Sequence, residues 1–343
     1  MRKQVYLINH VMSKDIESEI FSAILQYFKK YSPPWIVYVV SIEPIEGADV
    51  YHYHRPHLET KLAQPTVCTV HHDLDDPDIW HARQRFLPRY AEAAAVVCLN
   101  KTQREILIDE GISDDKLYVV PHGYNDKMLH LKSGYGRDIS KVTIGIASRR
   151  YGRRVKGEAY LHELVKRLDP DAFKFILVGQ DRSLDAADFR QLGFEVDVFE
   201  RLPYRVFQSF YEKIDLLLMC SSHEGGPANI PEALSTGTPL FSSAVGMAKD
   251  FVRHGQNGIV LTMNAEIDAL EITKVCVTDA ALLRQLSETC ASEASTILTW
   301  KKSVEGNVVV YSQILGMDLF SAPAQVCEKT NEPIDNNNVM AVA

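Results

Sequence analysis

Short apolar runs rich in valine and isoleucine alternate with amphipathic segments along most of the chain, which predicts alternating strands and helices. Strands are expected in the first part at 4–10, 35–42, 48–54, 65–72, 94–100 and 116–122. Between the first two, Ile16, Ile20, Ile24 and Phe28 recur every four residues, which predicts a helix. Continuous apolar strands separated by helices are typical of a parallel sheet covered on both faces, so we expect an α/β domain.

The pattern stops at residues 124–140, which are polar and show no period, and then begins again. The second series predicts strands at 141–148, 173–179, 194–200, 215–222 and 239–244, with helices near 157–168 and 204–213. Helical patterns continue to about residue 316. Two such series predict two Rossmann-like domains that face each other across a cleft, with ligands beyond the carboxyl ends of the strands.

Composition narrows the functional classes. The 343 residues are 46% apolar and 24% charged, and the net charge of −8 argues against a nucleic-acid partner, although a local basic patch could still meet a membrane surface. No apolar run approaches the ~20 residues that span a bilayer, and the first apolar run is too short for a signal peptide. The six scattered cysteines form no CxxC pair, so we expect a reduced, cytoplasmic protein, with contact at the inner face of a membrane left open.

The passage after the strand at 215–222 carries two glutamates, Glu224 and Glu232, eight residues apart. Each has an ordinary structural interpretation. Asn229 and Glu232 have the spacing of a capping box at a helix start, and Glu224 can be a solvated loop carboxylate. On spacing alone these interpretations are at least as good as a binding role.

A binding role uses the same passage differently. Gly225 and Gly226 lack side chains, so a ligand can approach the backbone, and their N–H groups and that of Ala228 can turn toward an anion at the helix start. The two glutamates would then accept hydrogen bonds from hydroxyl groups on either side of that anion. A molecule with hydroxyls on both sides of a diphosphate is a nucleotide sugar.

Residues 221–261 resemble the Glu-x7-Glu signature of retaining glycosyltransferases of the GT-B fold, the large family-4 group. Further segments resemble that family in the same order: "RRYGRRVKG" (149–157), the strand, helix and linker entry at 94–125, "DVYHYH" (49–54), "TVHH" (69–72) and "TWKKSVEGNVVVY" (299–311). The resemblance implies an acceptor domain at 1–125, a linker at 126–140 and a donor domain at 141–300. It also implies a helix at 301–318 that crosses back to the first domain, and we expect a disordered tail at 319–343.

The resemblance also implies roles for individual residues. Those implied at the reaction centre are His71, Glu224, Arg150 and Lys156, and those implied at the donor are Arg150, Lys156, Arg201, Leu202, Glu224, Gly225, Gly226, Ala228 and Glu232. Glu232 would bind the ribose and Glu224 the transferred sugar, while Arg150 and Lys156 would hold the diphosphate. The main chain near Arg201 would meet the base, and His71 would face the anomeric centre. Fixed cations suit this chemistry because negative charge develops on the departing diphosphate, although a charge in the run 149–154 can also be an ordinary solvated one.

The function implied is transfer of a sugar from a nucleotide donor, with UDP or GDP favoured, to an acceptor hydroxyl with retention of configuration. It needs no metal and no cofactor, and it belongs in glycan, polysaccharide or glycoconjugate biosynthesis with a sugar, lipid-linked or small-molecule acceptor. A nucleotide-sugar epimerase or hydrolase of the same fold and a non-catalytic nucleotide-sugar-binding protein are the alternatives.

Some residues fall outside the resemblance. The loop after the first strand lacks the family's glycines, so no diphosphate contact is expected at residues 10–17. The histidines at 52–57 with "HHDLDD" (71–76) permit a metal cluster, but a cleft wall lined with histidines is favoured, and His122 is expected to pack at the hinge. Four residues have no assigned role: His54, His72, His223 and Asp250.

Overall fold

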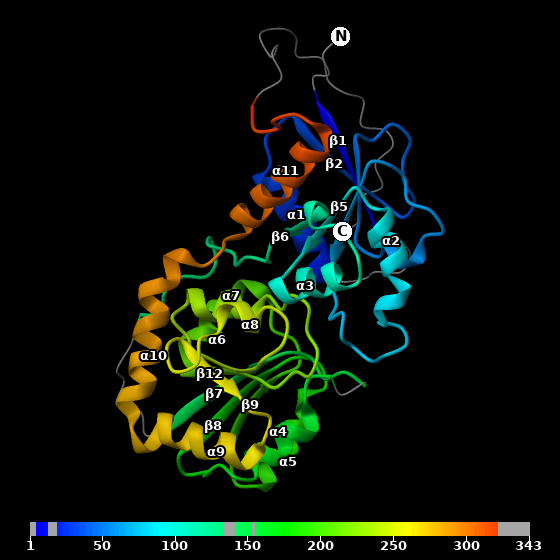
Figure 1. Ribbon diagram of the computed structural model, residues 1–343. Coiled ribbons are helices and arrows are strands. Elements are labelled where there is room, and N and C mark those ends of the chain that lie inside the picture. The colour runs from blue at the N-terminus through cyan, green and yellow to red at the C-terminus, as the bar shows by residue number, and fades with distance from the viewer. Residues whose placement is uncertain (1–4, 13–18, 134–140, 153–154, 322–343) are drawn as a thin grey trace.

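The computed structural model describes residues 5–12, 19–133, 141–152 and 155–321, and it contains two six-stranded parallel sheets, one above the other in Figure 1. The first sheet has the order β2-β1-β3-β4-β5-β6 and the second the order β12-β11-β10-β7-β8-β9. The strands of the first sheet are β1 (Tyr6–Val11), β2 (Ile36–Ser41), β3 (Val50–Tyr53), β4 (Thr66–Val70), β5 (Ala95–Cys98) and β6 (Leu117–Val119). Those of the second are β7 (Val142–Ala147), β8 (Phe173–Val178), β9 (Glu195–Phe199), β10 (Leu216–Met219), β11 (Leu240–Ser243) and β12 (Gly258–Leu261).

Helices lie between most consecutive strands, as parallel connections require. The α-helices are α1 (Glu19–Tyr31), α2 (Leu87–Glu92), α3 (Lys101–Asp109), α4 (Glu158–Val165), α5 (Arg182–Gln191), α6 (Phe207–Lys213), α7 (Asn229–Ser235), α8 (Ala248–Phe251), α9 (Ala265–Thr273), α10 (Ala280–Glu293) and α11 (Trp300–Leu315). Short 3-10 turns are η1 (Pro56–Leu58), η2 (Arg83–Arg85), η3 (Asp114–Lys116), η4 (Tyr204–Val206) and η6 (Ala294–Thr296), and η5 (Lys274–Thr278) is a π-helix.

The hydrophobic pattern predicted these elements closely. Each of the eleven expected strands is present within one to three residues of its expected ends, and the two parallel α/β sheets confirm the fold class. The sequence interpretation missed β12, which begins with Gly258, a residue type uncommon in strands. In α1, Ile24 and Phe28 face the core as expected, whereas Ile16 lies outside the described residues.

The last helix packs on the first sheet although it follows the second sheet in sequence. Val304 and Val308 of α11 join the core that contains Ile8 of β1, and Figure 1 shows α11 beside α1 and β1. Leu319, just after this helix, is fully buried, and its carbonyl accepts a 2.8 Å hydrogen bond from Trp35 Nε1. Within the described part of the chain no helix is both long and apolar enough to cross a membrane.

Strand order decides where the functional residues gather. In the second sheet the chain starts at β7 and returns to its other side at β10, so the loops after these two neighbouring strands diverge and leave a crevice. The loop after β7 carries Arg150 and Lys156, and the loop after β10 carries Glu224. The loops after β4 and β5 of the first sheet contact this same edge, so the carboxyl edges of the two sheets face each other.

Candidate active site

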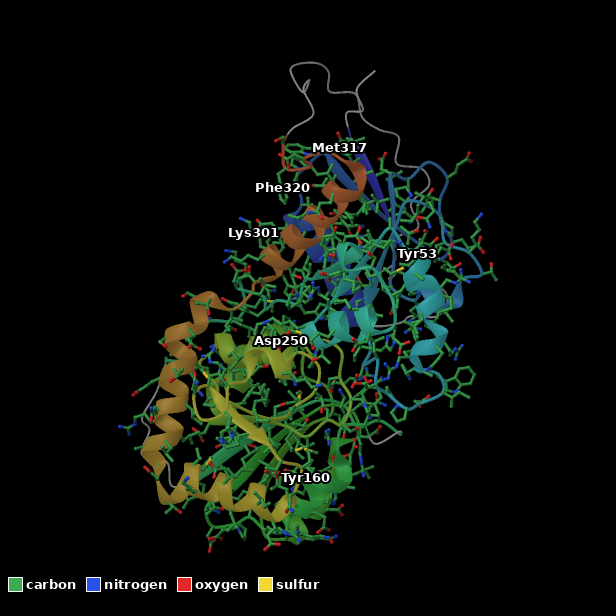
Figure 2. All side chains as sticks on the ribbon, viewed as in Figure 1. Tyr53, Tyr160, Asp250, Lys301, Met317 and Phe320 are labelled. Atoms are coloured by element: carbon green, nitrogen blue, oxygen red, sulfur yellow. The ribbon has the colours of Figure 1, made fainter. Side chains whose placement is uncertain are left out.

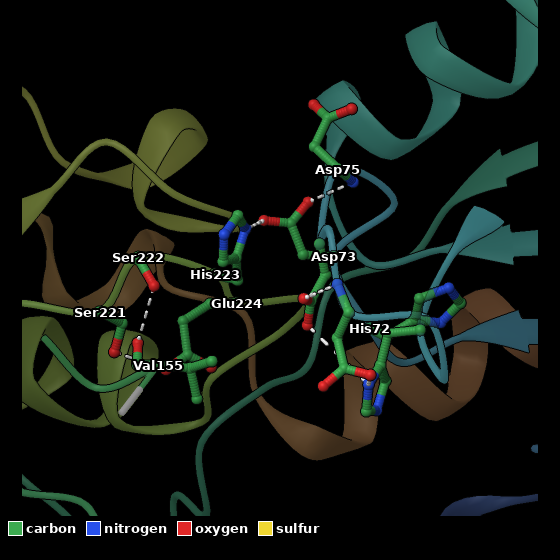
Figure 3. Close-up of polar contacts among 12 residues, drawn as sticks. His72, Asp73, Asp75, Val155, Ser221, Ser222, His223 and Glu224 are labelled. Carbon is green, nitrogen blue, oxygen red and sulfur yellow. Dashed lines mark hydrogen bonds and ion pairs between the residues drawn. The ribbon is translucent and has the colours of Figure 1, made fainter. Parts of the chain in front are cut away.

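Lys156 and Glu224 form an ion pair at this edge, between the loops after β7 and β10. The side chains of Lys156 and Glu224 are only 14% and 12% exposed, and Ser221 Oγ donates a further 2.7 Å hydrogen bond to the same carboxylate oxygen. Figure 3 shows Glu224 beside Ser221 and the loop at Val155. The interpretation of Glu224 as a solvated loop carboxylate is therefore wrong.

Gly157 explains why the lysine reaches this position. Its φ of +75° is left-handed, and a Cβ at this residue would lie 1.9 Å from the carbonyl oxygen of Cys220 at the end of β10. Only glycine allows that approach together with that backbone angle. The Lys-Gly pair in the sequence thus brings the lysine against the neighbouring strand.

Arg150 lies beside an acidic residue of the second domain. Its Nε lies 3.7 Å from the Asp185 carboxylate on α5, and its side chain is 26% exposed, so it is no freely solvated charge. The same carboxylate accepts a 2.6 Å hydrogen bond from Arg182 and lies 3.0 Å from His162. No described contact joins Arg150 to the Lys156–Glu224 pair.

Arg182 is a residue that the sequence analysis missed. It is 1% exposed, and it donates hydrogen bonds to the carbonyl and hydroxyl oxygens of Ser148 at 2.8 and 2.9 Å. With Ser148, Lys156 and Asn229 it lines a small cavity at the carboxyl ends of β7 and β10. No sequence pattern indicates Arg182, because its contacts are with Ser148, which follows a neighbouring strand and is distant in the chain.

Glu232 is buried in α7 between two phenols. Tyr204 donates a 2.7 Å hydrogen bond to one carboxylate oxygen and Tyr211 a 3.0 Å bond to the other. Burial raises the pKa of Glu232 to about 7, and the hydrogen bonds from the two tyrosines oppose this shift without cancelling it. Both phenols come from the segment after β9, and the sequence analysis missed them.

The capping-box interpretation of this helix is wrong. The N-cap of α7 is Ala228, and no side chain caps it. The Asn229 amide nitrogen donates instead to the Ala147 carbonyl at 3.3 Å, and its oxygen is buried without a partner among the described residues. The Glu232 carboxylate thus faces the tyrosines and does not return to the helix start.

The two glycines after Glu224 serve the contact between the domains. A Cβ on Gly225 would lie 2.4 Å from the carbonyl oxygen of His71, and one on Gly226 would lie 2.5 Å from Leu99. The Gly225 carbonyl accepts a 2.9 Å hydrogen bond from Asn100 of the first domain. The backbone bonds of the described residues leave the N–H groups of both glycines free. A side chain at either position would therefore collide with the first domain.

The remaining donor-site candidates, Arg201 and Leu202, lie in the segment after β9. Arg201 is exposed after β9, whereas Leu202 is half-buried and packs against the second-domain core together with Tyr204. Tyr204 connects this segment to Glu232, so the segment expected to meet a base and the residue expected to bind a ribose are neighbours. His122 is buried at the hinge, where its Nδ1 lies 2.9 Å from the Gly226 carbonyl oxygen, as the sequence indicated.

Two residues without an assigned role connect the domains. The Asp250 carboxylate accepts a 2.9 Å hydrogen bond from the backbone N–H of Lys101 at the start of α3, and Figure 2 shows Asp250 at the junction between the domains. His223 Nδ1 lies 3.1 Å from the Asp73 carboxylate of the first domain (Figure 3). Both therefore hold the first domain against the Glu224 loop.

His71 lies at the cleft end of a line of histidines. Its Nε2 is 2.8 Å from Nδ1 of His54, and Nε2 of His54 is 2.8 Å from Nδ1 of His10. Burial is the main reason that the pKa of His54 falls to about 3 and that those of His10 and His71 fall well below the usual range. The cleft wall expected from the sequence is present, and its histidines are neutral.

His10, His52 and His54 have ring nitrogens within 4.8 Å of one another, so the three side chains are close enough to be considered as metal ligands. The nitrogens of His52 are instead 2.6 Å from the hydroxyls of Tyr311 and Thr69. The 2.8 Å distance between His10 Nδ1 and His54 Nε2 is that of a hydrogen bond. Two imidazole nitrogens bound to one tetrahedral metal at ~2.0–2.1 Å would be about 3.3 Å apart. These distances therefore favour a hydrogen-bonded cluster over a metal site.

The acidic residues after β4 and His72 are likewise bound elsewhere. Asp73 pairs with His223 and Asp75 with Arg83, so they face different partners and not a common ion. The His72 ring packs against Phe86 in a tilted arrangement, with ring centroids 3.8 Å apart. The acidic residues after β4 and His72 therefore show no shared ion site among the described residues.

Two family models match the chain, one for each sheet. The model described as Glycosyltransferase Family 4 matches residues 15–127, and the model described as Glycosyl transferases group 1 matches residues 141–294. The two matches leave residues 1–14, which include β1, the segment 128–140 and residues 295–343 unmatched.

Curated relatives are distant. The MMP alpha-(1->4)-mannosyltransferase of Mycolicibacterium hassiacum is 21% identical over 288 residues, which are 74% of this chain and 67% of the relative. The UDP-Gal:alpha-D-GlcNAc-diphosphoundecaprenol alpha-1,3-galactosyltransferase of Escherichia coli is 25% identical over 215 residues. That match covers 58% of this chain and 54% of the relative, so the chain spans only about half of the second relative's length.

Solved structures share the architecture. Anabaena HepE, crystallised with UDP and glucose, is 17% identical with a TM-score of 0.68, and the match covers 91% of this chain and 98% of that one. The sucrose-phosphate synthase of Thermosynechococcus elongatus is 14% identical with a TM-score of 0.72, and the match covers 91% and 99%. At these identities the likeness establishes the fold alone.

Proposed function

This chain belongs to the group 1 glycosyltransferases of the GT-B fold and uses a nucleotide-sugar donor, and we propose that it transfers a hexose to an acceptor hydroxyl with retention of configuration and without a metal. The observation that carries this proposal is the Lys156–Glu224 pair at the carboxyl ends of β7 and β10, with Glu232 held between two phenols close by. This arrangement supports the proposal because a cation and two carboxylates are the groups expected to hold a diphosphate, a sugar and a ribose.

Lys156 supplies the charge that the leaving group needs. The Glu224 carboxylate compensates the charge of the Lys156 ammonium group in the structure. A donor diphosphate offers Lys156 a stronger anionic partner and frees Glu224 to accept hydrogen bonds from the hydroxyls of the transferred sugar. Arg150 would leave Asp185 for the diphosphate, and Asp185 would keep Arg182 as its partner.

Glu232 would bind the ribose hydroxyls. Each carboxylate oxygen has two lone pairs, so it can accept from a ribose hydroxyl as well as from Tyr204 or Tyr211. Leu202 and the main chain of Arg201 would meet the base. The free N–H groups of Gly225 and Gly226, together with Ala228 at the N-cap of α7, would face the diphosphate.

The reaction proposed is a transfer on one face of the sugar. The bond between the anomeric carbon and the diphosphate oxygen breaks, the acceptor oxygen forms a bond on the same face, and the acceptor proton passes to the departing diphosphate oxygen. Glu224 is already engaged by Lys156 and Ser221, which favours a binding role over that of a covalent nucleophile. His71 approaches from the first domain.

The names of the relatives and neighbours indicate which donors and acceptors to consider first. HepE structures hold UDP or UDP-glucose, and the Escherichia coli relative is named for a UDP-galactose donor and a diphosphoundecaprenol-linked acceptor. We therefore favour UDP, with GDP as the other candidate, and a sugar, lipid-linked or small-molecule acceptor in polysaccharide or glycoconjugate synthesis. A lipid-linked acceptor would bring the protein into peripheral contact with the inner face of a membrane.

A binding screen followed by a transfer assay tests the proposal. Thermal shift with the UDP, GDP, ADP and dTDP forms of common sugars identifies the donor. Wild-type protein is then incubated with that donor and a panel of glycoside and lipid-linked acceptors, with and without EDTA, and the anomeric proton of the product is observed by NMR.

Each proposed feature has its own outcome in this assay. An inverted product refutes retention, and loss of transfer in EDTA refutes metal independence. Epimerisation or rapid release of free sugar from the donor alone refutes an acceptor-directed transferase. The absence of turnover with a bound donor across the whole panel refutes the enzymatic proposal.

A further inference from the structure

Three imidazoles form a line from the cleft into the interior of the first sheet. His71 follows β4, His54 follows β3, and His10 lies within β1. Each contact joins the Nε2 of the outer ring to the Nδ1 of the inner ring, at 2.8 Å in both cases. His71 is partly exposed and keeps its Nδ1 free of the line, whereas His10 and His54 are 0% and 4% exposed.

The protonation of the three rings is linked. Because burial lowers the pKa of each ring below its ordinary value, all three are neutral near pH 7. A neutral imidazole has one N–H and one lone pair, so it must donate at one nitrogen and accept at the other. The direction chosen at one end of the line therefore determines the tautomer at the other end.

The inner end of the line decides that direction. The Nε2 of His10 is buried and has no hydrogen-bond partner among the described residues. Aromatic rings surround His10, with the centroids of Phe28 and Tyr38 at 4.8 and 5.3 Å. A buried N–H without an acceptor is less tolerated than a buried lone pair, so the His10 proton belongs on Nδ1, where it is donated to His54.

We propose that His10 and His54 are positioning residues that hold His71 as its Nδ1–H tautomer. His10 donates to His54, and His54 donates through its Nδ1–H to Nε2 of His71. The remaining proton of His71 is then on Nδ1, the nitrogen outside the line. His71 presents a hydrogen-bond donor to the cleft and no basic nitrogen.

This inference deepens the proposed function. The role of the His71 N–H in sugar transfer rests on that function, whereas the tautomer of His71 does not. An N–H at this position can donate to an oxygen of the donor sugar as the sugar is oriented for attack. It cannot take the proton of the acceptor hydroxyl, which agrees with passage of that proton to the leaving diphosphate. The tautomer itself can be measured without any substrate.

The test is a long-range proton–nitrogen NMR spectrum of the imidazoles in the uniformly nitrogen-15-labelled full chain near pH 7. The His71 signals are assigned by their loss in His71→Gln. We expect Nδ1 of His71 to have the chemical shift of a protonated nitrogen and Nε2 that of an unprotonated one, with the same pattern in His54 and His10. A protonated Nε2 in His71, or two averaged shifts, overturns the proposal.

Two variants test whether the line carries the tautomer. His10→Phe removes the inner donor, and we expect the His71 nitrogens to shift toward averaged values. His52→Asn is the matched control, because His52 stacks on His10 at 4.8 Å but lies outside the line. If His10→Phe leaves His71 unchanged, or if His52→Asn moves it equally, the proposal is refuted.

Activity is measured separately with the donor and acceptor found in the transfer assay. We expect His10→Phe to lower kcat several-fold while the KM for the donor changes little, because His71 is retained but misprotonated. An unchanged kcat together with an altered tautomer refutes a positioning role in catalysis. Failure of the wild-type enzyme to transfer a sugar would refute the proposed function and leave the tautomer result standing.

Discussion

Replacement of Glu232 by glutamine separates the stability of this protein from its binding of nucleotide. Burial raises the pKa of Glu232 from an ordinary 4.5 to about 7. In the folded state the carboxyl therefore keeps its proton over a range of pH in which the unfolded chain has lost it. The carboxyl contributes fully to stability below about pH 4.5, and that contribution is lost as the pH rises toward 7.

The magnitude follows from the difference between the two pKa values. The pKa rises from 4.5 to about 7, and at ~1.4 kcal/mol for each pH unit the loss is about 3.5 kcal/mol at alkaline pH. Glutamine has nearly the same shape, has no charge to desolvate, and can still bond to Tyr204 and Tyr211. We expect Glu232→Gln to match the wild type near pH 4 and to be about 3.5 kcal/mol more stable near pH 9.

Urea unfolding followed by tryptophan fluorescence at several pH values measures this difference. The comparison is made between variants at each pH, because other groups titrate over the same range. Glu288→Gln, on an exposed position of α10, is the matched control and should change stability little at any pH. Thermal shift with UDP should show weaker nucleotide binding by Glu232→Gln and normal binding by the control.

Two results would refute this reasoning. If the two proteins differ in stability by the same amount at pH 4 and pH 9, burial of the ionised Glu232 carboxylate does not destabilise the fold. Undiminished nucleotide binding by Glu232→Gln would show that the ribose does not depend on this carboxylate.

Two further substitutions test the centre and the domain contact. Lys156→Ala should lower turnover on the order of 10²-fold, the scale of losing one charge that stabilises the leaving group, while the exposed Lys166→Ala should stay near normal; equal activity of the two would contradict the role of Lys156. Gly225→Ala places a Cβ 2.4 Å from the His71 carbonyl oxygen, so it should push the domains apart, raise the radius of gyration in solution scattering and lower turnover. Gly152→Ala meets nothing within 4 Å and is its control, and a compact, fully active Gly225→Ala protein would show that the contact is dispensable.

The sequence predicted the fold well because burial on both faces leaves a strong local mark. Strands such as "LLLM" (Leu216–Met219) are continuously apolar and fully buried, so their positions follow from the chain alone. β12 was missed because one of its four residues is a glycine, which weakens the apolar signal of the strand. The capping box was wrong because Asn229 and Glu232 have the right spacing while tertiary partners take both side chains.

The residues of the candidate site also fall into those that local sequence patterns indicate and those that only tertiary contacts reveal. The sequence by itself determined the two α/β repeats and singled out Lys156, Glu224 and Glu232, because strand periodicity and loop motifs are local in the chain. Only the tertiary structure joined Lys156 to Glu224, which are 68 residues apart, and directed Arg150 to Asp185. It also placed Tyr204 and Tyr211 on Glu232 and aligned three histidines from three strands. Such contacts depend on the order of the strands in each sheet and on the way the two domains meet at the carboxyl edges of the sheets. The spacing of residues along the chain does not indicate either of these.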